Sequence, residues 1–325
     1  MMLVLVEHDR GVLAPATEEA LTCGRSLAAG LGVPLHALSI GATADGLVSA
    51  LASYGVHTVH QAHHTVLTDY SPEAWGATLA QLVSALSPVA VLATGTDRGN
   101  EVMAQAAAVL DVPMVANCIT VTPGSGPWEL TRVRWGGSLL EQATVDAPVK
   151  LLTLSHHAVA GELATTAGPA VPNEFVPTLD DSLARSMVVD RVERGSGVTL
   201  ATARVVIGGG RGVGSPEAFA PLEELAALLE GRVGCSRAVT NNGWRPHTDQ
   251  VGQTGTRIAP DIYFACGISG AIQHWVGAMA SKKILAINTD PDANMVSRAD
   301  YAVIGDLHQV IPAITAEIKR RRAGG

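Results

Sequence analysis

Two runs of alternating strand and helix signals constrain the fold of this chain more than any other feature of its sequence. In the first run, short apolar segments alternate with segments of helical spacing from Leu3 to Leu154. The alternation returns in the second run, between Arg204 and Arg322. Such alternation is typical of βαβ units and of a mostly parallel sheet. A length of 325 residues at ~150 residues per domain also favours two domains, so we expect a two-domain α/β protein.

The first run predicts a mostly parallel sheet that ends in a hairpin. Helical spacing stops near Trp128, and the two strands that follow are expected to turn around Gly136-Gly137. The expected strands are Leu3–Val6, Leu35–Ile40, Val56–Val59, Val89–Thr94, Met114–Ile119, Leu130–Trp135, Leu139–Val145 and Val149–Leu154. The expected helices are Glu18–Ala29, Thr43–Ser53, Pro72–Leu86 and Gly99–Leu110.

The second run predicts a doubly wound parallel sheet. Its expected strands are Arg204–Ile207, Arg232–Cys235, Ile262–Cys266, Ile284–Ile287 and Tyr301–Ile304. Its expected helices are Pro216–Leu229, Ser269–Met279 and Leu307–Arg322. Residues 156–200, between the two runs, are rich in Gly and Pro and show little periodicity, which indicates a linker. We therefore expect domains at residues 1–194 and 195–325, with the charged stretch Arg191–Arg194 on the surface.

Composition and charge exclude several classes of protein. A net charge of −8 without a basic stripe argues against a nucleic-acid partner. No apolar run reaches the ~18–20 residues that a membrane span needs. Four widely spaced cysteines without a CxxC pair indicate neither a disulfide framework nor a zinc site, and no other metal cluster stands out. The first residues read as a strand rather than a leader, so we expect a cytoplasmic protein. Charged residues make up 16%, against ~25% in typical domains, which suggests that a partner covers part of the surface.

The ends of the second-run strands point to a ligand site. Ligands of open parallel sheets bind beyond the carboxyl ends of the strands. Every expected strand here is followed by glycine or by a small or hydrogen-bonding residue: Gly208–Gly212, Ser236-Arg237, Gly267–His274, Asn288 and Gly305-Asp306. Five such ends favour one extended ligand across the sheet. Each feature has a plain structural alternative: a glycine turn, a surface arginine, a helix N-cap at Asp306, or a buried core histidine at His274.

The residue types narrow the chemistry of that ligand. Backbone N–H groups after a strand can meet phosphates, and Arg211 and Arg237 suit a pyrophosphate or an electron-rich ring. Asn288 and Asp306 suit ribose or adenine. The stretch 241–260 is too long for a simple connection and is expected to be functional. Its Gln253 and Thr254 could orient a neutral heteroaromatic ring. No catalytic acid, base or nucleophile can be nominated.

At these motifs the sequence resembles the alpha subunits of electron transfer flavoproteins. The motifs occur in the order and spacing of that family: Gly209–Gly212, Gly234–Arg237, Gln250–Gly255, Gly267–His274, Ala286–Asn288, Ala299–Tyr301 and Gly305–Leu307. Strong resemblance covers about residues 203–315. The first half matches more loosely, through Val4–His8 and Ala93–Glu101.

The resemblance implies an FAD-binding second domain and a first domain that packs against a homologous beta subunit in a heterodimer. It implies an electron carrier between dehydrogenases and a downstream acceptor, such as a respiratory quinone reductase or another oxidoreductase. It places Arg237 and Thr254 at the flavin ring, His274 at its C2 carbonyl, and Asn288 and Asp306 at the AMP half. The full implied set is Arg211, Ser236, Arg237, Val251, Gly252, Gln253, Thr254, Ser269, Gly270, Ala271, Ile272, Gln273, His274, Asn288, Asp306 and Leu307.

The electrostatic expectation concerns the charge that reduction adds to a flavin. A cation ~4 Å away, at an effective dielectric of ~20, contributes about 4 kcal/mol. His274 or Arg237 could supply that cation. Cys235, the Thr240–Trp244 stretch and Trp275 depart from the family pattern, and both Trp244 and Trp275 are expected near the flavin.

Two other functions remain open from the residues. One is a self-contained flavin- or nicotinamide-dependent enzyme on the same sheet. Related sheets of thiamine-dependent decarboxylases carry a Gly-Asp-Gly segment before an Asn-Asn pair, and here Asn241-Asn242 lacks that segment. The other is an adenosine-nucleotide-binding regulatory module built on the first βαβ run.

Overall fold

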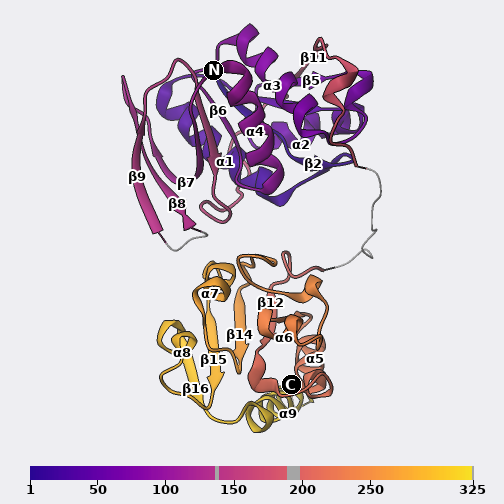
Figure 1. Cartoon of the computed structure of the whole chain (residues 1–325), viewed down its shortest axis with the longest axis vertical. Helices are drawn as coiled ribbons and strands as arrows, with labels where there is room; N and C mark the ends of the chain where they lie inside the picture. The colour runs from indigo at the N-terminus through magenta and orange to yellow at the C-terminus, as the bar shows by residue number, and fades with distance from the viewer. Residues whose placement is uncertain (136–138, 189–197, 324–325) are drawn as a thin grey trace. The chain divides into compact units, whose positions relative to one another are not determined.

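The computed structural model describes residues 1–135, 139–188 and 198–323, which divide into two compact units (Figure 1). The first unit comprises the described residues up to 188, and the second comprises those from 198 onward. In Figure 1 the first unit runs from indigo to magenta and the second runs through orange to yellow. Each has its own sheet and its own buried core.

In the described part of the first unit, nine strands form one sheet in the order β11-β5-β4-β1-β6-β10-β7-β8-β9. The strands from β11 to β7 are parallel, and β8 and β9 continue the sheet as antiparallel neighbours. Their bounds are Met2–Leu5 (β1), Leu35–Ile40 (β4), Thr58–Ala62 (β5), Ala90–Thr94 (β6), Met114–Thr122 (β7), Trp128–Arg134 (β8), Leu139–Val145 (β9), Lys150–Leu154 (β10) and Val171–Phe175 (β11). A small separate hairpin pairs β2 (His8–Asp9) with β3 (Val12–Leu13).

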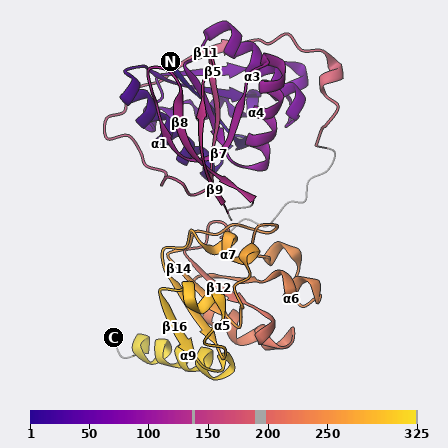
Figure 2. The ribbon, with the colours of Figure 1, turned by 60° about the vertical axis from the view of Figure 1, so that its left-hand side comes forward.

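Helices cover both faces of this sheet because successive side chains of a strand point to opposite faces. Helix α1 (Pro15–Leu31) packs on the face that carries Val4 and Leu92, and α2 (Val48–Ser53) joins the same core. Helices α3 (Pro72–Leu86) and α4 (Asp97–Leu110) pack on the face that carries Leu3 and Leu5. Figure 2 shows α1 on one side of the sheet and α3 and α4 on the other.

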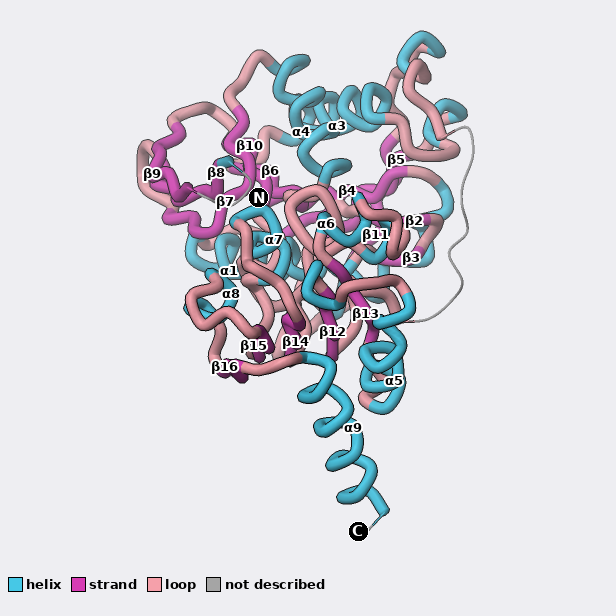
Figure 3. Tube along the Cα trace, turned by 60° about the horizontal axis from the view of Figure 1, so that its bottom comes forward, coloured by secondary structure: helices cyan, strands magenta, loops and turns pink. Residues whose placement is uncertain are grey.

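The sheet of the second unit is fully parallel, with described strands in the order β13-β12-β14-β15-β16 (Figure 3). Their bounds are Val205–Gly209 (β12), Arg232–Cys235 (β13), Ile262–Cys266 (β14), Ile284–Asn288 (β15) and Tyr301–Ile304 (β16). The chain first moves from β12 to β13 on one side and then crosses to β14 on the other. The point where the strand order reverses therefore lies between β12 and β14, and ligands of such sheets bind at that point.

Helices also cover both faces of the second sheet. Helices α5 (Ala220–Leu228) and α9 (Leu307–Ala323) pack with Ile207 and Phe264 in one core. Helices α7 (Ile272–Ala278) and α8 (Asn294–Arg298) pack on the opposite face, with Val206 and Tyr263. The short α6 (Arg237–Asn241) follows β13 directly. The expected α/β class with a doubly wound second sheet is confirmed.

Several elements match the sequence prediction at both ends. These are β4, β9, β13, β14, β16 and α3. The start of α3 is marked in the sequence by Pro72, which occupies the first position of the helix, where its missing N–H costs nothing. The expected helix Thr43–Ser53 instead begins as a 3₁₀ turn, Ala42–Leu47, before α2.

The expected linker of residues 156–200 is partly wrong, because it contributes strand β11 to the first sheet. The side chains of β11 are mostly exposed and show no apolar alternation, so the usual strand signal is absent. Pro172 is tolerated because β11 is an edge strand that pairs only with β5. The side chain of Asn173 also contacts His60, with 3.1 Å between Nδ2 and Nδ1.

Helix α7 begins three residues later than expected. Gly270 has a φ of +81°, a left-handed conformation that glycine adopts readily, so Ser269–Ala271 form a loop and not a first helical turn. His274 is consequently the third residue of α7. Helices α6 and α8 have five residues each and carry too few turns to give a periodic signal. The turn at Gly136-Gly137, the stretch Arg191–Arg194 and the expected boundary between residues 194 and 195 lie outside the described residues.

Candidate functional site

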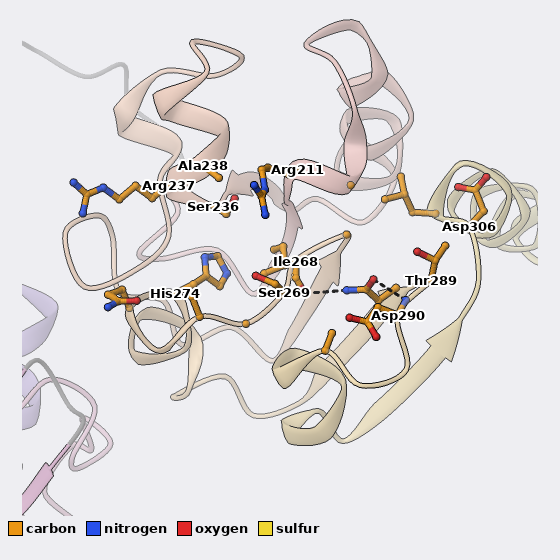
Figure 4. Close-up of a pocket in the computed structure, with 18 of the residues that line it drawn as sticks. Arg211, Ser236, Arg237, Ala238, Ile268, Ser269, His274, Thr289, Asp290 and Asp306 are labelled. Atoms are coloured by element: carbon orange, nitrogen blue, oxygen red, sulfur yellow. Dashed lines mark hydrogen bonds between the residues drawn. The ribbon is translucent and has the colours of Figure 1, made fainter.

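A pocket of about 600 Å³ lies at the carboxyl edge of the second sheet. Its walls come from the loops and helix starts that follow all five strands, as the sequence predicted (Figure 4). Expected residues in the wall are Arg211, Ser236, Arg237, Ser269, Gly270, Ala271, Gln273, His274, Asn288, Asp306 and Leu307. A volume of this size is typical of small-molecule and cofactor sites.

Sequence reasoning missed other wall residues. They are Ala238, Asn241, Thr289, Asp290 and Ala293, whereas Gly212, Gly267, Ile268 and Gly305 belong to the strand-end segments named from the sequence. Thr289 and Asp290 follow closely after the expected strand Ile284–Ile287, so extending its end by three residues would have found both. Ala293 precedes α8 and gave no signal, because α8 itself was not predicted.

The loops after β12 and β14 touch backbone to backbone. An ideal Cβ on Gly210 would lie only 2.1 Å from the carbonyl oxygen of Gly267. The amide of Gly212 donates to that same carbonyl over 3.2 Å. Glycine at position 210 is therefore required by this close approach, which fixes the floor of the pocket where the strand order reverses.

One wall of the pocket offers hydrogen-bond donors suited to an anion. Arg211 and Arg237 are exposed, and neither forms an ion pair with a described residue. In Figure 4 the Arg211 side chain points into the middle of the pocket, and Arg237 extends outward at its edge. Among the described residues, the N–H groups of Ser269, Gly270 and Ala271 meet no acceptor. Unpaired guanidinium and N–H groups of this kind bind phosphate groups well.

At the opposite end of the pocket, polar side chains hold the loops in place. The Asn288 amide donates to the Ile268 carbonyl over 3.1 Å, and its oxygen accepts from the Asp290 N–H over 3.1 Å (Figure 4). Asp306 accepts from the N–H of His308 over 2.9 Å, as an N-cap of α9 does. Asn288 and Asp306 thus line the pocket while they position the loops after β14, β15 and β16.

The loop Gln250–Gly255 does not line this pocket. Val251 is buried in the core, and neither Gly252, Gln253, Thr254 nor Ile272 is part of the wall that the described residues form. The loop is nevertheless fixed beside α7, since the Gln253 N–H donates to the Gln273 carbonyl over 2.7 Å. Gln250 accepts from the Thr240 hydroxyl and donates to the Thr254 hydroxyl, each over 2.9 Å. This chain of hydrogen bonds orients Thr254 at the rim.

His274 is buried at the pocket with one ring nitrogen unused. Its Nε2 lies 2.8 Å from the Tyr263 hydroxyl, and its Nδ1 has no partner among the described residues. Burial lowers the pKa of His274 to about 4, with the nearby Val251 carbonyl acting in the opposite direction. The side chain is therefore neutral at pH 7 in the chain without FAD. A buried polar group without a partner costs ~1–3 kcal/mol, so a bound ligand that pairs with Nδ1 is favoured.

The two tryptophans expected near the flavin pack elsewhere. Trp244 lies against the core below α5 and α9, and Trp275 lies against the opposite core, where Arg298 sits 5.1 Å above its ring. Neither belongs to the wall of the pocket. Cys235 is buried, and burial raises its thiol pKa to about 12. Cys235, Trp244 and Trp275 therefore contribute to packing, whereas Asn241 of the departing stretch lines the pocket.

The corresponding edge of the first sheet is filled by its own side chains. Its strand order reverses between β1 and β6, and two cavities there measure only about 10 and 20 Å³. Tyr70, Trp75 and Arg98 line both of them, with Arg98 4.8 Å above the Tyr70 ring. Cavities of this size hold about one water molecule at most, whereas small-molecule sites measure ~300–1,000 Å³. The structure therefore gives no support to a nucleotide site here.

The described residues contain neither a membrane-spanning helix nor a cluster of metal ligands. None of their helices combines the length and the apolar character needed to cross a membrane. Within the same part of the chain, no three His, Cys, Asp or Glu side chains gather in a way that could hold a metal ion.

Both units of the chain match known protein families. Residues 199–279 match the family model described as the electron transfer flavoprotein FAD-binding domain, and residues 2–179 match the electron transfer flavoprotein domain. The electron transfer flavoprotein subunit alpha of Bacillus subtilis is 33% identical over 321 residues, covering 98% of this chain and 97% of that protein. The subunit alpha of Mycobacterium tuberculosis (strain CDC 1551 / Oshkosh) is 35% identical, with 99% of both chains covered. Protein FixB of Bradyrhizobium diazoefficiens is 35% identical over 328 residues, covering 98% of this chain and 88% of that protein.

Proposed function

This chain belongs to the electron transfer flavoprotein family as an alpha subunit, and from that premise we propose that it passes electrons from dehydrogenases to a downstream oxidoreductase. Its role is electron transfer and its cofactor is FAD. A respiratory quinone reductase is the acceptor class we favour. The observation that carries the proposal is the pocket at the carboxyl edge of the second sheet, with unpaired arginines and an unpartnered buried nitrogen on His274.

The donor set of the pocket fits FAD. When bound, FAD supplies redox chemistry that no side chain of this chain can supply, because its ring system accepts and releases electrons. Arg211 and the N–H groups of Ser269–Ala271 would bind the pyrophosphate. Asn288, Asp306 and Leu307 would line the AMP half. The Nδ1 of His274 is the one buried side-chain polar atom of the pocket wall, within the described residues, that has no partner, so it would meet a polar atom of the ring.

The remaining expected residues act around the ring. Ser236 and Arg237 would lie over it, since they follow β13 next to the reversal of the strand order. Gln253 and Thr254 would reach it from the rim, held by the Gln250 hydrogen bonds. The chain offers the ring hydrogen-bond donors and excludes water on the His274 side. Val251, Gly252, Gly270, Ala271, Ile272 and Gln273 would contribute backbone groups and packing.

The family implies a heterodimer with a beta subunit. We assign the surface that meets this subunit to the first domain, residues 1–194, and the FAD site to residues 195–325. The low fraction of charged residues agrees with a covered surface. We propose a cytoplasmic location.

Purification of the chain together with a beta subunit tests this function. We expect a yellow protein with the visible spectrum of a bound flavin, which is bleached by a dehydrogenase and its substrate and recovers with a quinone reductase. A colourless protein, or one whose flavin turns over a small substrate without any second enzyme, would contradict the proposal.

Arg211→Ala tests the pyrophosphate assignment. Removing an unpaired cation that points into the pocket is expected to weaken FAD retention at least tenfold, because charge-assisted hydrogen bonds contribute ~1.5–3 kcal/mol. FAD retention is measured by absorbance after gel filtration. The matched control is Arg204→Ala, at the amino end of β12, where Arg204 pairs with Asp261 over 2.7 Å. Equal retention in both variants would refute the assignment.

A further inference from the structure

The hydrogen bond between Tyr263 and His274 joins strand β14 to helix α7 beneath the pocket. Tyr263 has no exposed surface, and its hydroxyl oxygen lies 2.8 Å from Nε2 of His274. The two rings are 6.1 Å apart between centroids. His274 lines the pocket, whereas Tyr263 does not. Tyr263 can therefore influence a ligand only through His274.

The direction of this hydrogen bond follows from what each group lacks. The Tyr263 hydroxyl has one hydrogen to donate, and His274 is its one hydrogen-bond partner among the described residues. If Nε2 carried the proton, the phenol hydrogen would be left without an acceptor. Nδ1 would then be an acceptor without a donor. If the phenol donates to Nε2, the proton of the neutral ring lies on Nδ1, and the backbone of Val251, which acts on this ring as a hydrogen-bond acceptor, favours that proton as well. The second arrangement leaves fewer buried groups unsatisfied, so it is favoured.

The groups around Tyr263 do not compete for its hydrogen. The thiols of Cys235 and Cys266 are the ionisable groups that act electrostatically on Tyr263. Burial raises the pKa of each thiol to about 12, so both are neutral and are weak acceptors at pH 7. Nε2 of His274 is therefore the strongest acceptor for the hydrogen of the Tyr263 hydroxyl.

We propose that Tyr263 is a positioning residue whose hydroxyl fixes His274 as the Nδ1–H tautomer, so that His274 presents a neutral hydrogen-bond donor to the FAD ring. The proposal rests on the FAD placement given above. It differs from the electrostatic expectation, because a neutral donor stabilises added electron density by one hydrogen bond and not by a full charge. It also gives a fully buried tyrosine a role in redox tuning.

Gly208 leaves the space that the Tyr263 hydroxyl occupies. An ideal Cβ at Gly208 would lie 2.2 Å from the Tyr263 hydroxyl oxygen, so any side chain there would displace the hydroxyl. Gly208, Gly209 and Gly210 are also absent from the wall of the pocket as the described residues form it. The glycine run at the end of β12 therefore makes room for neighbouring groups, and at position 208 that group is the tyrosine hydroxyl.

The first experiment reads the tautomer directly. Nitrogen-15 NMR of histidine-labelled protein, in the heterodimer stripped of FAD, is expected to show His274 neutral at pH 7 with its proton on Nδ1. His274→Gln identifies the signal. Tyr263→Phe and Gly208→Ala are each expected to yield a mixture of tautomers. A proton on Nε2 in the unaltered protein overturns the proposal, and this measurement needs no bound FAD.

The second experiment measures the midpoint potential of FAD in the heterodimer. Tyr263→Phe is expected to make reduction less favourable, by up to about a tenfold change in the ratio of FAD affinities, which is ~59 mV for one electron. In a His274→Gln background the same substitution is expected to add nothing. The control is Tyr54→Phe, a buried tyrosine of the first unit.

The outcomes separate the two proposals. An unchanged potential in Tyr263→Phe, or a shift that is additive with His274→Gln, overturns the role of Tyr263. A heterodimer that never binds FAD contradicts the proposed function instead, and the tautomer measurement still stands.

Discussion

At the scale of single residues, His274 shows where sequence reasoning reached its limit. The sequence placed His274 in the site by its position after a strand end, and the structure puts it in the pocket wall. Its protonation could not be predicted, because that depends on burial and on Tyr263, which contacts it through the fold. The sixteen implied residues divide in a similar way: those next to strand ends lie in the pocket wall except Ile272, and those of the Gln250–Gly255 loop do not.

The depressed pKa of His274 makes the stability of the FAD-free chain depend on pH. The folded-state pKa is about 4 and the unfolded value about 6.5, so the stability is complete above pH 6.5 and is lost as pH falls toward 4. The difference corresponds to about 3 kcal/mol at most. His274→Gln is expected to lose less stability between pH 7 and 4.5 than the unaltered chain, as measured by urea unfolding.

An exposed histidine supplies the control for this prediction. His308 lies near the start of α9 with its side chain exposed. His308→Gln should keep the full pH dependence of the unaltered chain. Equal slopes for His274→Gln and the unaltered chain would show that His274 does not titrate in this window.

At the scale of elements, periodicity predicted most strands and helices, and the exceptions have local causes. Strand β11 was not predicted because its side chains are mostly exposed. Its place in the sheet depends on backbone hydrogen bonds to β5. The late start of α7 depends on the left-handed conformation of Gly270. The loop Gln250–Gly255 was recognised by its length, but its anchoring beside α7 is a tertiary contact that no local pattern encodes.

Gln250 is expected to be the residue that holds this loop. Gln250→Leu removes both hydrogen bonds and leaves the Thr240 and Thr254 hydroxyls without them. We expect a loss of ~1–3 kcal/mol in the unfolding free energy of the FAD-free chain, together with faster hydrogen exchange in residues 250–256. Gln253→Leu, an exposed position in the same loop, should change the unfolding free energy by less than ~0.5 kcal/mol. Similar losses for both would mean that the Gln250 chain does not hold the loop.

At the scale of the whole molecule, the chain contains a mostly parallel sheet and a fully parallel sheet, and their carboxyl edges leave different amounts of space for a ligand. The sequence predicted both sheets and the general rule for where a ligand binds. It could not predict that the carboxyl edge of the first sheet is filled by Tyr70, Trp75 and Arg98, because that depends on how α3 and α4 pack. The pocket of about 600 Å³ belongs to the second sheet.

Removal of FAD is therefore expected to affect one unit selectively. In hydrogen exchange by mass spectrometry on the heterodimer, loss of FAD should raise exchange in peptides that cover residues 266–274 and 305–309. Peptides that cover β1 and β6 should keep their exchange rates, since the cavities at their ends are too small for a ligand. A matching increase at β1 and β6 would place a second binding site in the first unit.

The edge strand β11 has a consequence for synthesis on the ribosome. Strand β5 ends at Ala62, but the strand that covers its outer edge begins only at Val171, more than a hundred residues later. At ~5–20 residues per second, the hydrogen-bonding edge of β5 stays open for ~5–20 s in the nascent chain. An open edge recruits other strands, so this interval is when the emerging protein most needs a chaperone. Slow codons between these two strands would lengthen the exposure, and fast ones would shorten it.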